Sequence, residues 1–345
     1  MEIYELDPIR DPRWERLVQR HGHGSVFHSP NWLAALQHVY GYEPLAISTS
    51  SPTQELTNGL VYCRVKSWLT GPRLVSVPFS DHCDALVDNS EELDSLVLHM
   101  KRSVDEDKWK YIEIRPASLH PGIQVGLGKS DTYYFHVLDL GRKAEELFRS
   151  FHKDCVQRKV RRAEREQLRY EEGSSDALLE QFYKLLVMTR RRQFLPPQPL
   201  DWFRGLIASF GEMLKIRVAF KGDVPVASIL TVSYKDTITY KYGCSDARFN
   251  NLGGTPFLFW RTIQQAQEGG FEKLDMGRSD TDNAGLVAFK EHWGAPRSVL
   301  SYWRYPNRLH VRQSTWKQDL AKQLVLIAPD VSLTAVGRLL YRHIG

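Results

Sequence analysis

Hydrophobic and polar positions along the chain follow two periods, and the clearest succession of the two lies between residues 237 and 294. Alternating β-branched and aromatic residues predict a buried strand, and a second short strand follows a helical stretch. Thr255 and Pro256 suit the N-cap and the first position of that helix, and Gly269-Gly270 suits its end. The predicted elements are strand 237–243, a glycine turn, helix 257–268, strand 271–277, a polar loop and a short helix.

The same periodicities recur through the rest of the chain and predict mixed strands and helices in two successive groups. The predicted helices cover residues 31–40, 92–104, 153–167 and 176–192. The predicted strands cover residues 44–49, 60–67, 73–77, 110–115, 133–140, 214–220, 224–234 and 299–304. Helices on both faces of mixed strands, twice over, indicate two α/β units.

Length and composition agree with a two-domain globular protein. The chain has 345 residues, of which 42% are hydrophobic and 25% charged, and this excludes a disordered chain. No apolar run approaches the roughly 18 residues that a membrane span needs. Residues 1–7 are acidic and lack the order of a secretion signal. We therefore expect a cytoplasmic protein.

The four cysteines show no metal-ligand spacing, so we expect free thiols and no metal site. Cys244, at the end of the strand 237–243, is a conceivable nucleophile. The net charge is +5, and residues 153–169 hold seven Lys or Arg against three acids. Such a basic segment suits an anionic ligand, a membrane surface or RNA.

The glycine turn marks a candidate site. Gly253 and Gly254 precede the predicted helix, whose first N–H groups and positive dipole end favour a phosphate or carboxylate ligand. The polar loop after the strand 271–277 lies at the end of the sheet where ligands bind in open α/β folds.

The succession of motifs resembles FemAB-like proteins, and most closely the subgroup found beside exopolysaccharide and exosortase genes. The motifs are a helix ending in Ala-x-x-Gly-Gly, then Leu-Asp-Met-Gly-Arg-Ser at 274–279 and Ala-Phe-Lys-Glu-His-Trp-Gly at 288–294. The segments 74–81, 153–168 and 189–197 resemble further signatures of that family. The resemblance implies two tandem GNAT-like acyltransferase domains with mixed α/β sheets. We expect them at residues 1–141 and 142–305, followed by a basic amphipathic extension over 306–345.

The resemblance, together with the position of the polar loop, indicates three catalytic residues. Lys290 falls on the family's motif lysine, which lies at the donor or acceptor site and would stabilise an oxyanion. Asp275 would orient a substrate amine or hold Arg278, and Asp81 would accept a proton. The structural alternatives are a solvated lysine on a short helix and two aspartates that form turns.

The residues expected to bind donor or substrate lie around the same motifs. The arginines of the basic segment suit a phosphate, although a solvated helix face has the same pattern, with Val156, Val160 and Ala163 on its buried side. Tyr242 is either a hydrogen-bond donor to a leaving group or a core tyrosine. Asn251 stands where acetyl-CoA-binding GNAT enzymes have a glycine. The full set is Arg158, Arg161, Arg162, Tyr242, Arg248, Gly253, Gly254, Gly277, Arg278, Ser279 and Phe289.

From these residues and the resemblance we expect direct transfer of an acyl or aminoacyl group onto an amine or hydroxyl of a cell-envelope or exopolysaccharide precursor, glycan- or lipid-linked. No cofactor is expected to be tightly bound. The co-substrate is either acyl-CoA or aminoacyl-tRNA, and the latter makes tRNA a partner. The basic tail suggests peripheral contact with the inner membrane. The alternative is a degenerate GNAT-like module that acts as a binding or scaffold protein.

Overall fold

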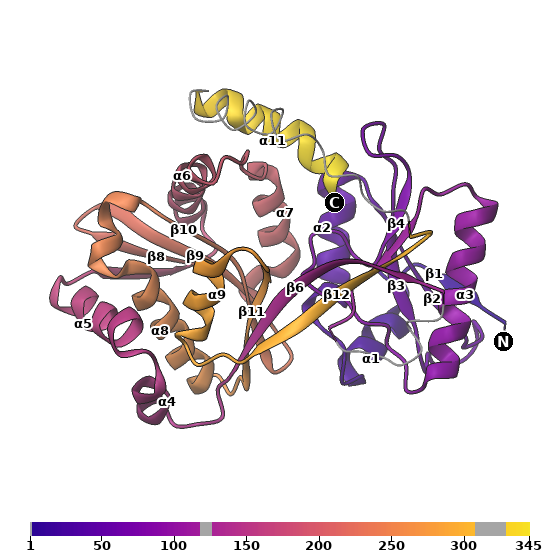
Figure 1. Ribbon diagram of the computed structural model, residues 1–345, viewed down its shortest axis with the longest axis horizontal. Helices are drawn as coiled ribbons and strands as arrows, with labels where there is room; N and C mark the ends of the chain where they lie inside the picture. The colour runs from indigo at the N-terminus through magenta and orange to yellow at the C-terminus, as the bar shows by residue number, and fades with distance from the viewer. Residues whose placement is uncertain (1, 118–125, 308–328) are drawn as a thin grey trace. The chain divides into compact units, whose positions relative to one another are not determined.

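The computed structural model describes residues 2–117, 126–307 and 329–345, which form two compact units (Figure 1). Among these residues, the first unit comprises 2–133, 299–307 and 339–345, and the second comprises 134–298 and 329–338. The domain boundaries expected at 141 and 305 stay a prediction. Much of the expected basic extension, residues 308–328, lies outside the described residues.

The first unit is built on a mixed sheet with buried residues on both faces. Its strand order is β1 (Tyr4–Leu6), β2 (Glu43–Ser48), β3 (Leu60–Val65), β4 (Arg73–Val75), β5 (Ile112–Ile114) and β12 (Arg297–Tyr305), and only β4 and β5 of the pairs described run parallel. Leu60 and Tyr62 pack with helix α3 (Ser90–Glu106), whereas the alternate residues Val61 and Cys63 are buried on the other face. This period of two fixes which side chains meet each helix.

Two helices with strong N-terminal signals cover the opposite face of this sheet from α3: α1 (Pro12–Arg20) and α2 (Pro30–Tyr40) (Figure 1). Each begins with a proline, and Asp11 and Ser29 are the N-caps, with the Ser29 side chain accepting the Trp32 N–H at 3.2 Å. The helix predicted over 31–40 is thereby confirmed, whereas α1 was not predicted.

A fully buried histidine follows the first of these helices. The Nε2 of His28, in the short 3₁₀ helix η1 (Val26–His28), lies 2.8 Å from the carbonyl of Asp84, and its Nδ1 accepts the Ser25 N–H at 3.1 Å. Burial is the main reason that the pKa of His28 is lowered to about 4. His28 is therefore neutral in the folded protein at neutral pH.

The second unit places a glycine-started helix against a larger sheet. From Tyr134 of β6 (Gly128–Asp139) its order is β6, β11 (Lys273–Asp280), β10 (Thr237–Ser245), β9 (Val224–Tyr234), β8 (Leu214–Lys221) and β7 (Arg169–Gly173). Strands β10 and β11 run parallel to each other. The pairs β10–β9, β9–β8 and β8–β7 are antiparallel. The two-residue turn at Gly222-Asp223 joins β8 to β9.

Helices cover both faces of this second sheet (Figure 1). On one side lie α6 (Asp176–Arg192) and α7 (Leu200–Phe210), and on the other α5 (Arg158–Arg165) and α8 (Gly254–Glu268). The remaining elements are α4 (Ala144–Ser150), the π-helical turn η3 (Lys153–Gln157), the 3₁₀ helices η4 (Gly211–Met213) and η5 (Ala247–Leu252), and α9 (Ala284–Glu291). Helix α11 (Asp330–Ile344) ends the chain.

Several predictions about the second unit can be judged directly. The helix predicted over 176–192 is α6, and Val156, Val160 and Ala163 are buried together as expected. The N-cap predicted at Thr255 is wrong: helix α8 begins at Gly254, and Gly253 is its N-cap in the left-handed conformation. None of the helices in the described parts of the chain is both long and apolar enough to cross a membrane.

We predict that His28 makes the stability of the protein depend on pH. The unfolded chain binds a proton on this side chain near pH 6.5, whereas the folded protein does so only near pH 4. Stability is therefore full above about pH 6.5 and falls by about 3 kcal/mol as the pH drops toward 4. Urea unfolding at several pH values measures this slope. A His28→Gln variant should have a flatter profile, and the exposed control His38→Asn should keep the original one; equal slopes in all three would contradict the prediction.

Candidate functional site

Two parallel strands of the second unit, β10 and β11, stop pairing toward their carboxyl ends. Residues Thr237–Thr239 of β10 pair with Lys273–Asp275 of β11, and β10 has an irregularity between Tyr240 and Tyr242. The register with β11 extends no further within the described residues, while β10 continues beside β9 as far as Ser245. Ligands of open α/β sheets bind beyond the carboxyl ends of such strands.

The start of helix α8 depends on two glycines. Gly253 has φ +80°, and a Cβ there would lie 2.2 Å from the carbonyl oxygen of Lys159 in α5. A Cβ on Gly254 would lie 3.0 Å from the Cβ of Ala227. Any larger residue at Gly253 is therefore excluded by conformation and by space. The glycines let α8 approach both α5 and the sheet. In its first turn the N–H groups of Gly254 and Thr255 remain for a ligand, since Pro256 has none and the Phe257 N–H is bonded to the Gly253 carbonyl.

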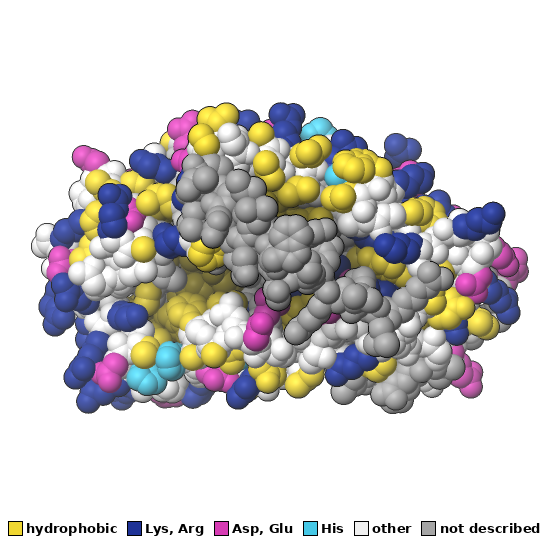
Figure 2. All heavy atoms as spheres, turned by 45° about the horizontal axis from the view of Figure 1, so that its top comes forward, with side chains coloured by type: hydrophobic (Ala, Val, Ile, Leu, Met, Phe, Trp, Pro, Cys, Tyr) yellow, Lys and Arg dark blue, Asp and Glu magenta, His cyan; other side chains and the backbone are white. Residues whose placement is uncertain are grey.

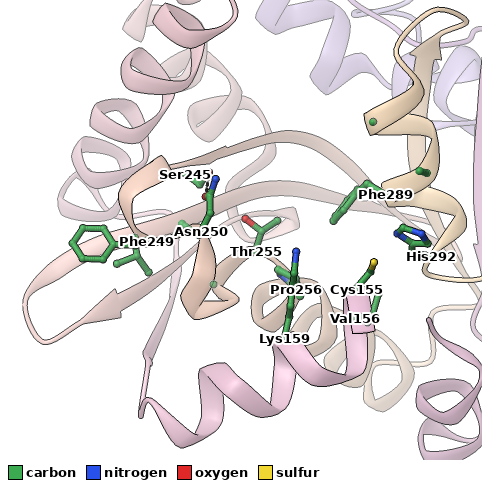
Figure 3. A pocket seen from close by; sticks show the side chains of 15 residues that line it. Cys155, Val156, Lys159, Ser245, Phe249, Asn250, Thr255, Pro256, Phe289 and His292 are labelled. Carbon is green, nitrogen blue, oxygen red and sulfur yellow. Dashed lines mark hydrogen bonds between the residues drawn. The ribbon is translucent and has the colours of Figure 1, made fainter. Parts of the chain in front are cut away.

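A cavity of about 410 Å³ opens at this helix start (Figure 3). Its walls come from η3 and α5, strand β9, the segment from Ser245 through the first turn of α8, and α9 with the residue that follows it. Contributing side chains and backbone include Cys155, Lys159, Ala227, Asn250, Gly254, Thr255, Phe289 and His292. A helix N-terminus, a lysine and several apolar groups around one space suit a ligand that carries both a phosphate and an apolar or amide portion.

Lys159 is the cation of this cavity. Its side chain rises from α5 toward the start of α8 (Figure 3). Among the described residues it has no ion-pair partner within 4.0 Å, so its ammonium is available to an anionic ligand. Lys159 belongs to the predicted basic segment, but the residues predicted to bind a ligand there were its arginines.

The three predicted arginines of α5 do not line the cavity. Arg158 forms an ion pair with Asp154 at 2.8 Å, and Arg162 forms one with Glu166 at 3.3 Å. Arg161 lies over the ring of Phe148. All three arginines are exposed. On the face drawn in Figure 2, Lys and Arg side chains are scattered among acidic and hydrophobic ones.

Lys290 is buried in a network that holds the end of β11. Its ammonium donates hydrogen bonds to the carbonyls of Gly277 at 2.7 Å and Arg278 at 2.9 Å, and the residue is 1% exposed. The Asp275 Oδ1 accepts the Gly277 N–H at 2.7 Å, where Gly277 has φ +70°. Lys290 and Asp275 thus fix the backbone of β11 where it leaves β10, and the cavity is lined by the neighbouring Phe289 instead.

Two further buried polar side chains belong to the same part of the second unit. His136 and Ser279 are both buried. Neither ring nitrogen of His136 has a hydrogen-bond partner among the described residues, and the Ser279 hydroxyl has none either. Burial, and next the positive charge of Lys290, lower the pKa of His136. His136 is therefore a neutral imidazole near the buried ammonium at neutral pH.

The other predicted residues have structural contacts. The hydroxyl of Tyr242 accepts the Trp202 Nε1–H at 2.8 Å in the core of the second unit, which matches the core alternative. Arg248 pairs with Asp246 at 2.6 Å. Asp81 belongs to the first unit, where its carbonyl accepts the hydroxyl of Tyr302 at 2.7 Å. Of the predicted set, the structure therefore brings Gly254 and Phe289 to the cavity, with Gly253 directly beside it.

The cavity wall also contains a group that sequence reasoning missed. Ligand atoms of His152, Cys155 and His292 lie within 4.8 Å of one another, in the one such group of His, Cys, Asp or Glu among the described residues. The spacing His-x-x-Cys was a usable signal. Its third member lies 137 positions further along the chain, and only the fold brings it near.

Comparisons with known proteins agree with this geometry. Residues 150–291 match the sequence model of the acetyltransferase (GNAT) domain. The matched segment contains helix α8, strands β10 and β11 and, except for His292, the residues that line the cavity. No curated protein matches the chain in sequence.

Solved structures extend the likeness to nearly the whole chain. The crystal structure of FemX is 17% identical, covers 94% of this chain and 100% of its own, and has a TM-score of 0.68. The C-terminal domain assigned to a lysylphosphatidylglycerol synthetase from Agrobacterium fabrum has 13% identity, 92% and 95% coverage and a TM-score of 0.56. A tandem GNAT protein from the clavulanic acid biosynthesis pathway has 10% identity, 89% and 99% coverage and a TM-score of 0.56. The predicted FemAB-like fold with two GNAT-like domains is confirmed.

We predict that the two lysines near the cavity differ in their effect on stability. Lys290→Met leaves two buried carbonyls without their charged donor and should lower the free energy of unfolding by roughly 2–4 kcal/mol. Lys159→Met removes an exposed charge and should change it by less than about 0.5 kcal/mol. Urea unfolding of both variants measures the difference. Equal effects would show that Lys290 does not hold the end of β11.

Proposed function

We propose that the protein transfers an acyl group from a phosphate-bearing thioester donor, acyl-CoA, to an amine or hydroxyl of a cell-envelope or exopolysaccharide precursor. The observation that carries the proposal is the cavity at the start of α8, where Lys159 and first-turn N–H groups converge beside the edge of β10. GNAT domains use acyl-CoA as a co-substrate.

The two ends of such a donor fit different parts of this site. Its phosphates would lie at the start of α8, where backbone N–H groups and the Lys159 ammonium favour negative charge. Its amide-containing arm would lie along β10 beyond Thr239, where the register with β11 has ended. Transfer from aminoacyl-tRNA is the competing donor hypothesis, and it predicts RNA binding with a steep salt dependence.

The reaction we propose is direct attack. The lone pair of the acceptor amine or hydroxyl forms a bond to the thioester carbonyl carbon, and the C–S bond breaks. The thiolate leaves, and the proton that the acceptor nitrogen or oxygen loses balances the one that converts the thiolate to a thiol. Backbone N–H groups at the edge of β10 would stabilise the oxyanion that develops during attack. Lys290 and Asp275 would act by holding the β11 backbone in position. The role expected of Asp81, in the first unit, stays a prediction.

The acceptor class rests on the resemblance and on the solved relatives. The name lysylphosphatidylglycerol synthetase describes the formation of an aminoacylated lipid, and FemX shares the fold over the whole of its own chain. A lipid- or glycan-linked precursor with an amine or hydroxyl is therefore our proposed acceptor. A cytoplasmic location, with contact to the inner membrane through the tail, belongs to the same proposal.

We predict that CoA binds through Lys159. Isothermal titration of CoA and acetyl-CoA should give saturable binding, and Lys159→Met should weaken it by roughly 10–100-fold, since a hydrogen bond to a charged group is worth about 1.5–3 kcal/mol. Arg158→Met is the matched control, because this neighbouring cation is ion-paired with Asp154 and does not line the cavity. Equal affinities in both variants would remove Lys159 from the donor site.

The same titrations separate the alternatives. Retention of tRNA with no CoA binding would favour an aminoacyl donor. Failure to bind either donor would favour the degenerate binding module, a hypothesis that agrees with the burial of Lys290 away from the cavity.

A further inference from the structure

Three potential metal ligands meet at one wall of the cavity. His152 and Cys155 lie at the start of η3, and His292 follows the last residue of α9. Their ligand atoms lie within 4.8 Å of one another, and the two imidazole ring centroids are 4.4 Å apart. A hydrogen bond of 2.8 Å from the His152 N–H to the His292 carbonyl ties the two segments together. The cluster is therefore fixed by backbone as well as by side chains.

The backbone also orients the His152 ring. Its Nδ1 accepts the N–H groups of Asp154 and Cys155, both at 3.2 Å, as the cap of η3. Because Nδ1 accepts these bonds, the neutral ring carries its proton on Nε2, and Nδ1 is the nitrogen whose lone pair could bind a metal. The ring would therefore have to rotate away from the two N–H groups before Nδ1 binds an ion, with Nε2–H left as the donor to water.

Cys155 differs from the other cysteines of the chain. Cys63, Cys83 and Cys244 are buried, whereas Cys155 is partly exposed and lines the cavity. Its sulfur points toward the His292 ring in Figure 3. A metal ion that binds a thiol which solvent can reach displaces the thiol proton into the solvent.

We propose that His152, Cys155 and His292 form a binding site for Zn²⁺. One thiolate and two imidazoles are ligands that zinc prefers, and the thiolate offsets one of the two charges of the ion. Bond lengths of about 2.3 Å to sulfur and 2.0–2.1 Å to nitrogen place tetrahedral ligands roughly 3.5 Å apart. Side-chain rotations that close the present separations by about an ångström would therefore complete the site, and His152 is exposed enough to rotate.

The fourth coordination position of a bound ion would face the cavity. Cys155 and His292 both line the cavity, so water or a ligand in the cavity would supply the fourth donor atom. A bound ion would also link η3 to the end of α9, which are two walls of the cavity. The inference stands without the proposed acyl transfer, because it concerns only the binding of a metal.

The direct test uses the full chain, without an affinity tag and freed of metal by a chelator. Titration with Co²⁺ should give one equivalent of binding with a thiolate-to-cobalt charge-transfer band and visible bands of tetrahedral intensity, and Zn²⁺ should abolish both. Cys155→Ser should remove the charge-transfer band. His292→Asn should weaken binding by more than the roughly 10–100-fold that outer-shell changes cost. The exposed His38→Asn is the control and should bind as the wild type does.

A second measurement uses the unmodified chain, so it does not depend on the folding of a variant. Alkylation followed by peptide mapping should modify Cys155 in preference to the three buried cysteines, and one equivalent of Zn²⁺ should protect it. Zn²⁺ should also raise the melting temperature of the wild type and of His38→Asn but not of Cys155→Ser. Binding that is unchanged in Cys155→Ser and His292→Asn, or alkylation that Zn²⁺ does not slow, would overturn the proposal.

Discussion

The close approach of helix α8 to α5 is the constraint on which the candidate site depends. The chain turns at Gly253 in a left-handed conformation that residues with a side chain avoid. A Cβ at this position would lie only 2.2 Å from the carbonyl oxygen of Lys159. This contact brings the positive end of α8 and the Lys159 side chain to the same space. The register of β10 with β11 ends at Thr239, and β10 continues to Ser245 at the cavity wall. Without the glycine turn, the cation, the helix start and the strand edge would not converge.

Two lysines in this region illustrate how burial decides the role of a charge. Lys290 is buried, and its ammonium donates hydrogen bonds to two backbone carbonyls. These bonds hold the end of β11 in place. Lys159 is exposed and lines the cavity, so its charge can be used by a ligand. The side chain with the clearest motif is thus a scaffold element in this structure, and a less distinctive neighbour faces the cavity.

The sequence predicted what depends on local pattern. Alternation and helical periodicity identified α6 and the buried face of α5, and the glycines before Phe257 marked the start of α8 within a few residues. It could not show that Tyr242 points into the core, because a strand pattern does not say which neighbour donates a hydrogen bond to its hydroxyl. It also could not place His292 beside Cys155, since that contact joins segments far apart in the chain. Local signals therefore located the site, and only the fold selected the side chains that face it.

We propose above all that a donor occupies the space between the start of α8 and the part of β10 that follows Thr239. Hydrogen exchange followed by mass spectrometry, with and without saturating acyl-CoA, tests it most directly. The account predicts slower exchange in peptides that contain residues 240–245 and 253–257, with little change in the first unit. Slower exchange confined to other segments, or none at any CoA concentration, would contradict it.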